Sequence, residues 1–281
     1  MAAQNKNASN PLHWASSRGH LGLARFLVGH GADVATQNEH GSTPLHRASS
    51  TGHLDVARFL IKHGADAAAQ DKNRSTPLHS ASSNGHLDLA RFLVEHGAKA
   101  AAQNKDGSTP LHSVSSWGHL DLARFLVEHG ADVTAQNNYG WTPLHRASSR
   151  GSLDLARFLI EHGADLVAQN KDGETALHEA SLSGHLDLAR FLVEHGTDPA
   201  AQNKDGKTPL HLASVNGHVK LAQFLAEHGT IQGTVLTAHA VPRIQQSTTS
   251  IRLVTRYTIL GRDSYIVQYH HAVRAVIEPQ S

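Results

Sequence analysis

Histidines are the residues of this 281-residue chain that could most readily do chemistry. The sequence contains 24 of them, and an imidazole can ligate a transition metal or transfer a proton near neutral pH. Their spacing argues against both roles, because 20 of the 24 recur at three fixed positions of a 33-residue pattern. A residue that returns with every period does the same local job in each copy. We therefore interpret these histidines as structural.

The recurring histidines form three sets. The first set closes the tetrapeptide Thr-Pro-Leu-His or a close variant: His13, His46, His79, His112, His145, His178 and His211. The second follows a glycine in the middle of the unit: His20, His53, His86, His119, His185 and His218. The third precedes a glycine near its end: His30, His63, His96, His129, His162, His195 and His228.

Motifs for catalysis are absent from the sequence. It has no cysteine and no H-E-x-x-H pair, which removes thiolate metal sites, cysteine nucleophiles and the common zinc hydrolase motif. A G-x-S-x-G elbow and a phosphate-binding glycine loop are missing too. We expect no enzyme activity, no catalytic residue, no metal ion and no cofactor.

The 33-residue pattern itself predicts the elements that hold these histidines. In the second copy, Thr43 can cap a helix over residues 44–51. Pro44 suits the first turn of this helix, where its missing N–H needs no partner. Gly52 ends that helix. A second helix is predicted over 54–62. Gly64 follows it at the position where a left-handed backbone conformation commonly ends a helix. Each copy is therefore read as helix, turn and helix.

A loop follows the second helix of each copy. In the second copy it covers residues 65–74, which are small or polar and read as an extended turn. Arg74 departs from the pattern, because the equivalent position elsewhere is glycine: Gly41, Gly107, Gly140, Gly173 and Gly206.

The tetrapeptide start, the central G-H-L and the closing H-G-A-D, repeated every 33 residues, resemble the ankyrin repeat. The resemblance covers residues 8–229 in seven units that start near 8, 41, 74, 107, 140, 173 and 206. It implies an all-α solenoid of stacked helix-turn-helix units with projecting loops, whose first helices and loop tips line a concave groove. It also implies a non-catalytic protein-interaction scaffold that binds another protein in this groove.

Positions that differ between units are candidates for recognising that partner. In units four and five they hold an aromatic and arginine group, where most other units have small, polar or acidic residues: Trp117, Tyr139, Trp141, Arg146 and Arg150. Aromatic residues and arginine dominate binding energy at protein interfaces. We predict that this group binds the partner, with local packing between neighbouring loops as the alternative.

A weaker candidate group lies in the first two units. It consists of Trp14, Arg18 and Arg47. Trp14 could instead cover the exposed end of the stack.

Charged pairs recur on the second helices. Asp55 and Arg58 stand three residues apart, a spacing that allows a weak surface ion pair, and the same pair returns in units three to six. Both residues change in unit seven, to Lys220 and Gln223. We expect the last unit to present a different face.

The 52 residues after Gly229 lose the 33-residue phase. This basic tail, residues 230–281, is expected to be poorly ordered or to form an irregular cap, with a functional module or a never-selected sequence as alternatives. The runs 251–260 and 265–269 are rich in β-branched and aromatic residues, so a β-hairpin with its turn at 261–264 is possible.

Composition sets few further limits. The net charge of +1 favours no class of partner, so nucleic acid is not expected to be one. No apolar stretch reaches the length of a membrane-spanning helix, and residues 1–10 do not form a secretion signal. A cytoplasmic protein is therefore expected, with the nucleus as an alternative.

Overall fold

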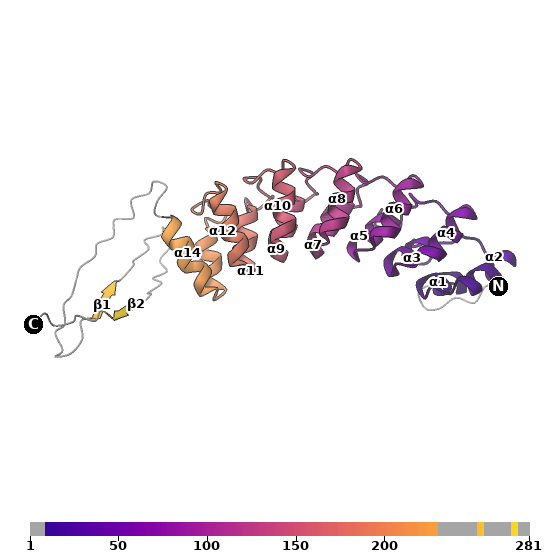
Figure 1. The fold of residues 1–281 in the computed structure, drawn as a ribbon, viewed down its shortest axis with the longest axis horizontal. Helices are drawn as coiled ribbons and strands as arrows, with labels where there is room; N and C mark the ends of the chain where they lie inside the picture. The colour runs from indigo at the N-terminus through magenta and orange to yellow at the C-terminus, as the bar shows by residue number, and fades with distance from the viewer. Residues whose placement is uncertain (1–8, 230–251, 256–270, 275–281) are drawn as a thin grey trace, which may run out of the picture. The chain divides into compact units, whose positions relative to one another are not determined.

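The computed structural model describes residues 9–229, 252–255 and 271–274. Fourteen helices run through the first of these ranges as seven consecutive pairs (Figure 1). The first helices of the pairs are α1 (Pro11–Ser17), α3 (Pro44–Thr51), α5 (Pro77–Ser83), α7 (Pro110–Trp117), α9 (Pro143–Arg150), α11 (Ala176–Ser183) and α13 (Pro209–Val215). The second helices are α2 (Leu21–Gly29), α4 (Leu54–Lys62), α6 (Leu87–Glu95), α8 (Leu120–Glu128), α10 (Leu153–Glu161), α12 (Leu186–Glu194) and α14 (Val219–Gly229).

Local sequence signals determine where each helix starts and stops. The backbone N–H of His46 donates to the hydroxyl of Thr43 at 3.4 Å, which caps the start of α3. Gly52 ends the helix with φ at 77°, and Gly64 follows α4 with φ at 94°. The helix bounds predicted for this unit are confirmed. Arg74 adopts the left-handed φ of 58° that its glycine counterparts adopt elsewhere.

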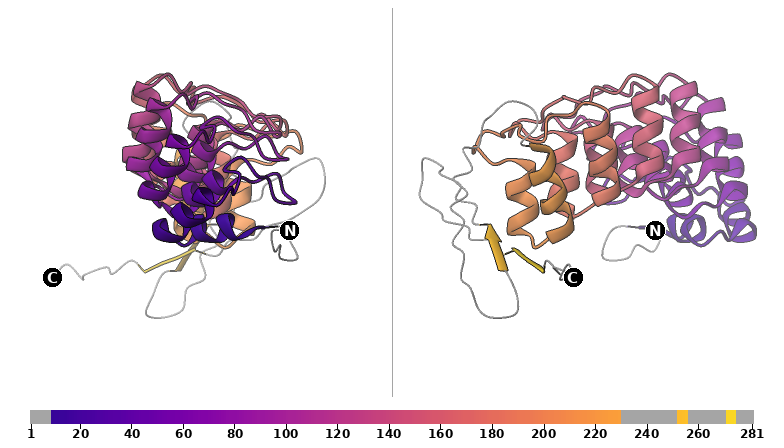
Figure 2. Two further views of the ribbon diagram at one scale, coloured as in Figure 1. Left: turned by 90° about the vertical axis from the view of Figure 1, so that its right-hand side faces the viewer. Right: turned by 60° about the vertical axis from the view of Figure 1, so that its left-hand side comes forward.

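Stacking of the pairs creates one continuous core. First helices contact the first helices of neighbouring units, second helices do the same, and the two helices of a unit contact each other. The leucine of each tetrapeptide lies in the centre of the stack, and Leu45, Leu78 and Leu111 are completely buried. Loops of successive units project to the same side (Figure 2). The predicted all-α stack of helix-turn-helix units is confirmed for this part of the chain.

Central histidines hydrogen-bond units two, three, six and seven to the unit before each of them. The imidazole Nε2 of His86 hydrogen-bonds to the carbonyl of Ser50 at 3.3 Å. A Cβ added to Gly52 would come within 2.6 Å of the same ring, so the turn between α3 and α4 has room only for glycine there. Equivalent hydrogen bonds are made by His53, His185 and His218.

Arginines of the second helices contact the next unit rather than an aspartate of their own helix. The guanidinium of Arg58 lies over the ring of Phe92 at 5.1 Å from its centroid. Among the described residues no ion pair joins Arg58 to Asp55, so the predicted surface pair is wrong. The same contact to the following phenylalanine is made by Arg91, Arg124, Arg157 and Arg190.

This contact also gives a reason for the altered seventh unit. Its arginine would need a phenylalanine in an eighth unit, and the pattern has no such residue after Phe224. Gln223 stands at the arginine position. At the other end, Phe26 is 59% exposed, whereas its equivalent Phe125 is 3% exposed between two neighbours. Trp14 on α1 is itself 47% exposed.

The chain divides into two units, residues 1–229 and 230–281. In the second, strands β1 (Arg252–Thr255) and β2 (His271–Arg274) pair antiparallel, with Arg252 opposite Arg274. β1 lies inside the first predicted run, whereas β2 follows the second predicted run. The predicted turn at 261–264 lies outside the described residues. None of the described helices combines the length and apolar character needed to cross a membrane.

Candidate protein-binding surface

The tetrapeptide histidines hold the loops that carry the candidate site. The backbone N–H of Thr109 donates to Nδ1 of His112 at 3.2 Å, and the Thr109 hydroxyl lies 2.9 Å from the same nitrogen. Since a backbone N–H can only donate, Nδ1 is the acceptor and Nε2 carries the proton. That proton is donated to the carbonyl of Trp141 in the next unit at 2.9 Å. The histidine therefore positions the backbone of a predicted site residue.

Burial keeps these histidines neutral. Loss of solvent around His112 lowers the pKa of its imidazole to about 4, against the opposing effect of the hydrogen bond to Trp141. The pKa is lowered for the same reason in the other internal copies: His13, His46, His79, His145 and His178. The structural interpretation is confirmed for these six histidines, whereas His211 in the last unit is exposed. Within the described part of the chain, no three His, Cys, Asp or Glu residues are placed to hold a metal ion.

Side-chain hydrogen bonds set the shape of each loop tip. The Oδ1 of Asn137 accepts the backbone N–H groups of Tyr139 and Trp141, each at 3.0 Å. The N–H of Lys171 in the next loop donates to the carbonyl of Tyr139 at 2.8 Å. The backbone of both aromatic residues is therefore held by Asn137 of their own loop, and that of Tyr139 also by Lys171 of the next loop.

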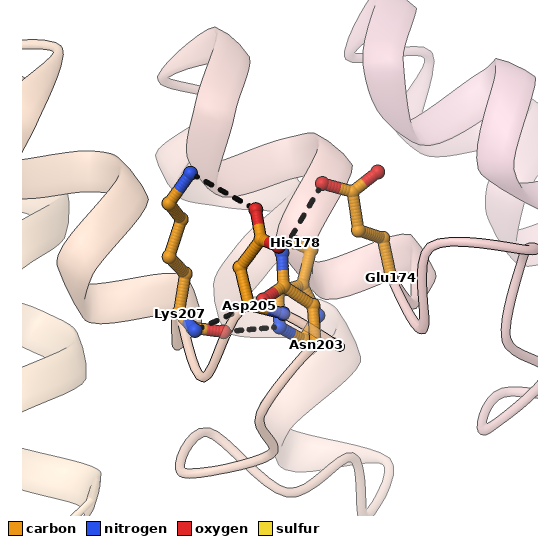
Figure 3. Close-up of polar contacts among 5 residues, drawn as sticks. All are labelled: Glu174, His178, Asn203, Asp205 and Lys207. Carbon is orange, nitrogen blue, oxygen red and sulfur yellow. Dashed lines mark hydrogen bonds and ion pairs between the residues drawn. The ribbon is translucent and has the colours of Figure 1, made fainter.

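Figure 3 shows the same arrangement at the last loop. Asn203 Oδ1 accepts the N–H groups of Asp205 and Lys207 at 3.1 and 2.9 Å, and His178 Nε2 donates to the Lys207 carbonyl at 3.2 Å. The Lys207 ammonium pairs with the Asp205 carboxylate at 3.3 Å. Asn203 also reaches back to the carboxylate of Glu174 at 3.5 Å. The loops are thus linked along the stack.

Four of the five predicted residues in units four and five form two ring-to-guanidinium pairs. Arg146 lies over the Trp141 ring at 4.2 Å from its centroid, within one unit. Arg150 lies over the Trp117 ring at 5.8 Å, between neighbouring units. Trp117 is 55% exposed, and Tyr139 at the loop tip is 56% exposed. Trp117, Tyr139 and Arg150 are therefore open to solvent, whereas Trp141 and Arg146 are half-buried.

The weaker group forms one similar pair. Arg18 lies over the Trp14 ring at 4.8 Å, and both residues are exposed. Arg47 on α3 is half-buried, and the structure pairs it with no ring among the described residues. Trp14 and Arg18 therefore form a pair in which Arg47 takes no part.

Sequence reasoning missed a buried carboxyl group near Arg146 and the second carboxyl group to which it hydrogen-bonds. Glu179 on α11 is 2% exposed, and its side chain hydrogen-bonds to that of Glu174. Burial raises the pKa of Glu179 to about 8, Glu174 raises it further, and Arg146 opposes the rise. Glu174 in turn accepts the side-chain N–H of Asn170 at 3.0 Å. Comparison between units could have found Glu179, because it occupies the repeat position of Arg146.

A family model described as ankyrin repeats (3 copies) matches the chain in five overlapping stretches: residues 1–71, 66–137, 99–170, 135–203 and 166–235. A search of curated proteins finds no match to the chain.

Proposed function

Because the chain belongs to the ankyrin-repeat family, we propose that it is a non-catalytic scaffold that binds another protein on the inner face of its repeats. Repeats of this family are generally protein-interaction modules and are typically without enzymatic activity. In this proposal residues 1–229 form the binding domain, and residues 230–281 are a separate basic tail.

One observation supports placing the partner at units four and five. Trp117 and Tyr139 are more than half exposed, although large aromatic side chains are usually well buried in a folded protein. Each tryptophan of the group is also held by an arginine. Rigid, exposed aromatic residues beside arginine are the usual centre of a protein interface. Trp14, Arg18 and Arg47 are proposed as a secondary contact.

Affinity capture from lysate tests the proposal. One bait is the whole chain, and the second carries Trp117→Ala, Tyr139→Ala and Trp141→Ala. A third bait carries Val215→Ala and Val219→Ala, which shortens exposed apolar side chains at the last repeat. We expect specific proteins to be retained by the first and third baits and lost from the second. Equal capture by all three would show that the partner binds elsewhere.

A further inference from the structure

The inner ends of the first helices carry an unbalanced charge. The residue after each tetrapeptide histidine and the residue four positions later define what we call the inner stripe. In the described structure this stripe contains four arginines, Arg18, Arg47, Arg146 and Arg150, and one acidic residue, Glu179. The four arginines outnumber this one acidic residue, whose side chain is 2% exposed. The stripe is therefore locally basic.

No carboxylate of the described residues pairs with the arginines of units four and five. The ion pairs in this part of the chain join Glu39 to His40 and Asp205 to Lys207. Glu174 accepts hydrogen bonds from Glu179 and from Asn170. Arg150 is exposed and Arg146 is half-buried, and a carboxylate of a partner can form charged hydrogen bonds with both guanidinium groups.

The arginines of the group lie beside aromatic rings. The guanidinium carbon of Arg146 is 4.2 Å from the centroid of the Trp141 ring, and that of Arg150 is 5.8 Å from the centroid of the Trp117 ring. A guanidinium has five N–H donors, and two of them together match the two oxygens of a carboxylate. The two arginines stand one turn apart on α9, a spacing of about 5–6 Å between their Cβ atoms. Neighbouring carboxylates of one peptide segment can reach both.

We infer that the inner stripe at units four and five binds an acidic segment of a partner protein, whose carboxylates pair with Arg146 and Arg150 while its apolar side chains lie against Trp117. This inference rests on the proposed scaffold function and adds the chemistry of the partner to it. It explains why arginine and tryptophan occur together three times in the repeats, at Trp14 with Arg18 and in the two pairs of units four and five.

A protein segment fits this surface better than nucleic acid does. The repeats carry −2 of the chain's net charge of +1, because the tail holds five arginines against two acidic residues. Nucleic-acid affinity comes mainly from many basic residues along a phosphate backbone. A negative domain with a few oriented arginines is suited instead to local recognition of carboxylates.

Fluorescence anisotropy with labelled, end-blocked peptides tests the inference on the whole chain. The probe is a short peptide of repeated Glu-Glu-Leu, compared with its Gln-Gln-Leu and Lys-Lys-Leu counterparts and with a single-stranded oligothymidine. We expect only the acidic peptide to bind. The double variant Arg146→Gln, Arg150→Gln should weaken that binding about tenfold or more, because it removes the charged hydrogen bonds that the two guanidinium groups donate.

The matched control is Lys62→Gln, Lys99→Gln, which removes the same charge from exposed positions outside the inner stripe. It should change the affinity less than about twofold, since exposed charges more than about 10 Å apart are largely screened. Equal weakening by both variants, equal binding of the glutamine peptide, or tighter binding of oligothymidine would overturn the inference. Lysate partners lost on Trp117→Ala, Tyr139→Ala, Trp141→Ala would in those cases still support the scaffold, so the two failures are distinguishable.

Discussion

At the scale of single residues, the tetrapeptide histidines couple folding to pH. Nδ1 of His112 accepts from Thr109, and Nε2 donates to Trp141. A second proton on Nδ1 would remove the acceptor that Thr109 needs. The neutral ring is therefore part of the folded structure, and the same holds where Thr43 and Thr76 face His46 and His79.

This coupling predicts a steep loss of stability in mild acid. The pKa of a histidine falls on folding from 6.5 toward lower values, to about 4 at His112. The unfolded chain therefore binds protons first as the pH falls below about 6.5, and each such group then favours unfolding. We expect thermal melts to show a large fall in Tm between about pH 6.5 and 5. A Tm that stays flat over this interval would contradict the account.

Glu179 has the opposite dependence on pH. Its pKa is raised to about 8 in the folded chain, against an ordinary value of 4.5, so the folded state holds a proton that the unfolded state has lost. Its contribution to stability is complete below about pH 4.5 and is lost as the pH rises toward 8. Glutamine imitates the protonated side chain without ionising.

Glu179→Gln should therefore stabilise the chain at alkaline pH, by on the order of 1–2 kcal/mol at about pH 8.5, and change little near pH 5. Tm measured at both values checks this. Glu161→Gln, at an exposed position of α10, is the control and should have little effect at either pH. A gain that is the same at both values would mean that ionisation of Glu179 is not its cause.

At the scale of elements, the contact between successive second helices is a stacked arginine rather than an ion pair. Arg124 of α8 lies over Phe158 of α10 at 4.9 Å, and among the described ion pairs none joins Arg124 to Asp121. An exposed contact of this type is worth about 0.5–1 kcal/mol. A lone surface aspartate is worth less.

Arg124→Ala should therefore destabilise the stack by about 1 kcal/mol, counting the lost packing of its aliphatic stem. Asp121→Ala should change stability by less than about 0.5 kcal/mol. Thermal or urea unfolding of the two variants gives the comparison. Equal losses of stability from both substitutions would instead indicate that Asp121 and Arg124 form the ion pair predicted from the sequence.

Helix bounds could be predicted from the sequence because their signals are local. Thr43, Pro44 and Gly52 act within one turn of their own position, and α3 starts and ends where they require. The partner of Arg58 could not be predicted in this way. It is Phe92, 34 residues further along the chain, and it depends on how one unit rotates against the next.

The residues of the candidate site could be predicted from the sequence, but their contacts could not. Trp117 and Arg150 were found by comparing units, since they depart from the repeated residues. That each ring lies under a particular arginine, and that Glu179 beside them is buried, depends on packing between α7, α9 and α11. A single sequence carries no signal for those distances.

At the scale of the whole repeat domain, one set of contacts is used many times. Histidine to carbonyl, histidine beside glycine, and arginine over phenylalanine each join a unit to a neighbour. Stability is then close to a sum over units and their interfaces. Trp117 and Tyr139 take no part in these three repeated side-chain contacts, so we call them released residues, and they can vary from unit to unit without loss of the stack. The central claim is that these released residues bind the partner.

The most direct test is the affinity of a captured partner for the whole chain and for Trp141→Ala, measured by isothermal titration. Val167→Ala, which shortens another exposed side chain, is the control. We predict that Trp141→Ala weakens binding about tenfold to a hundredfold, since truncation of such a residue costs about 1–3 kcal/mol, while the control binds as the wild type does. An unchanged affinity for Trp141→Ala would place the partner elsewhere on the molecule and contradict the account.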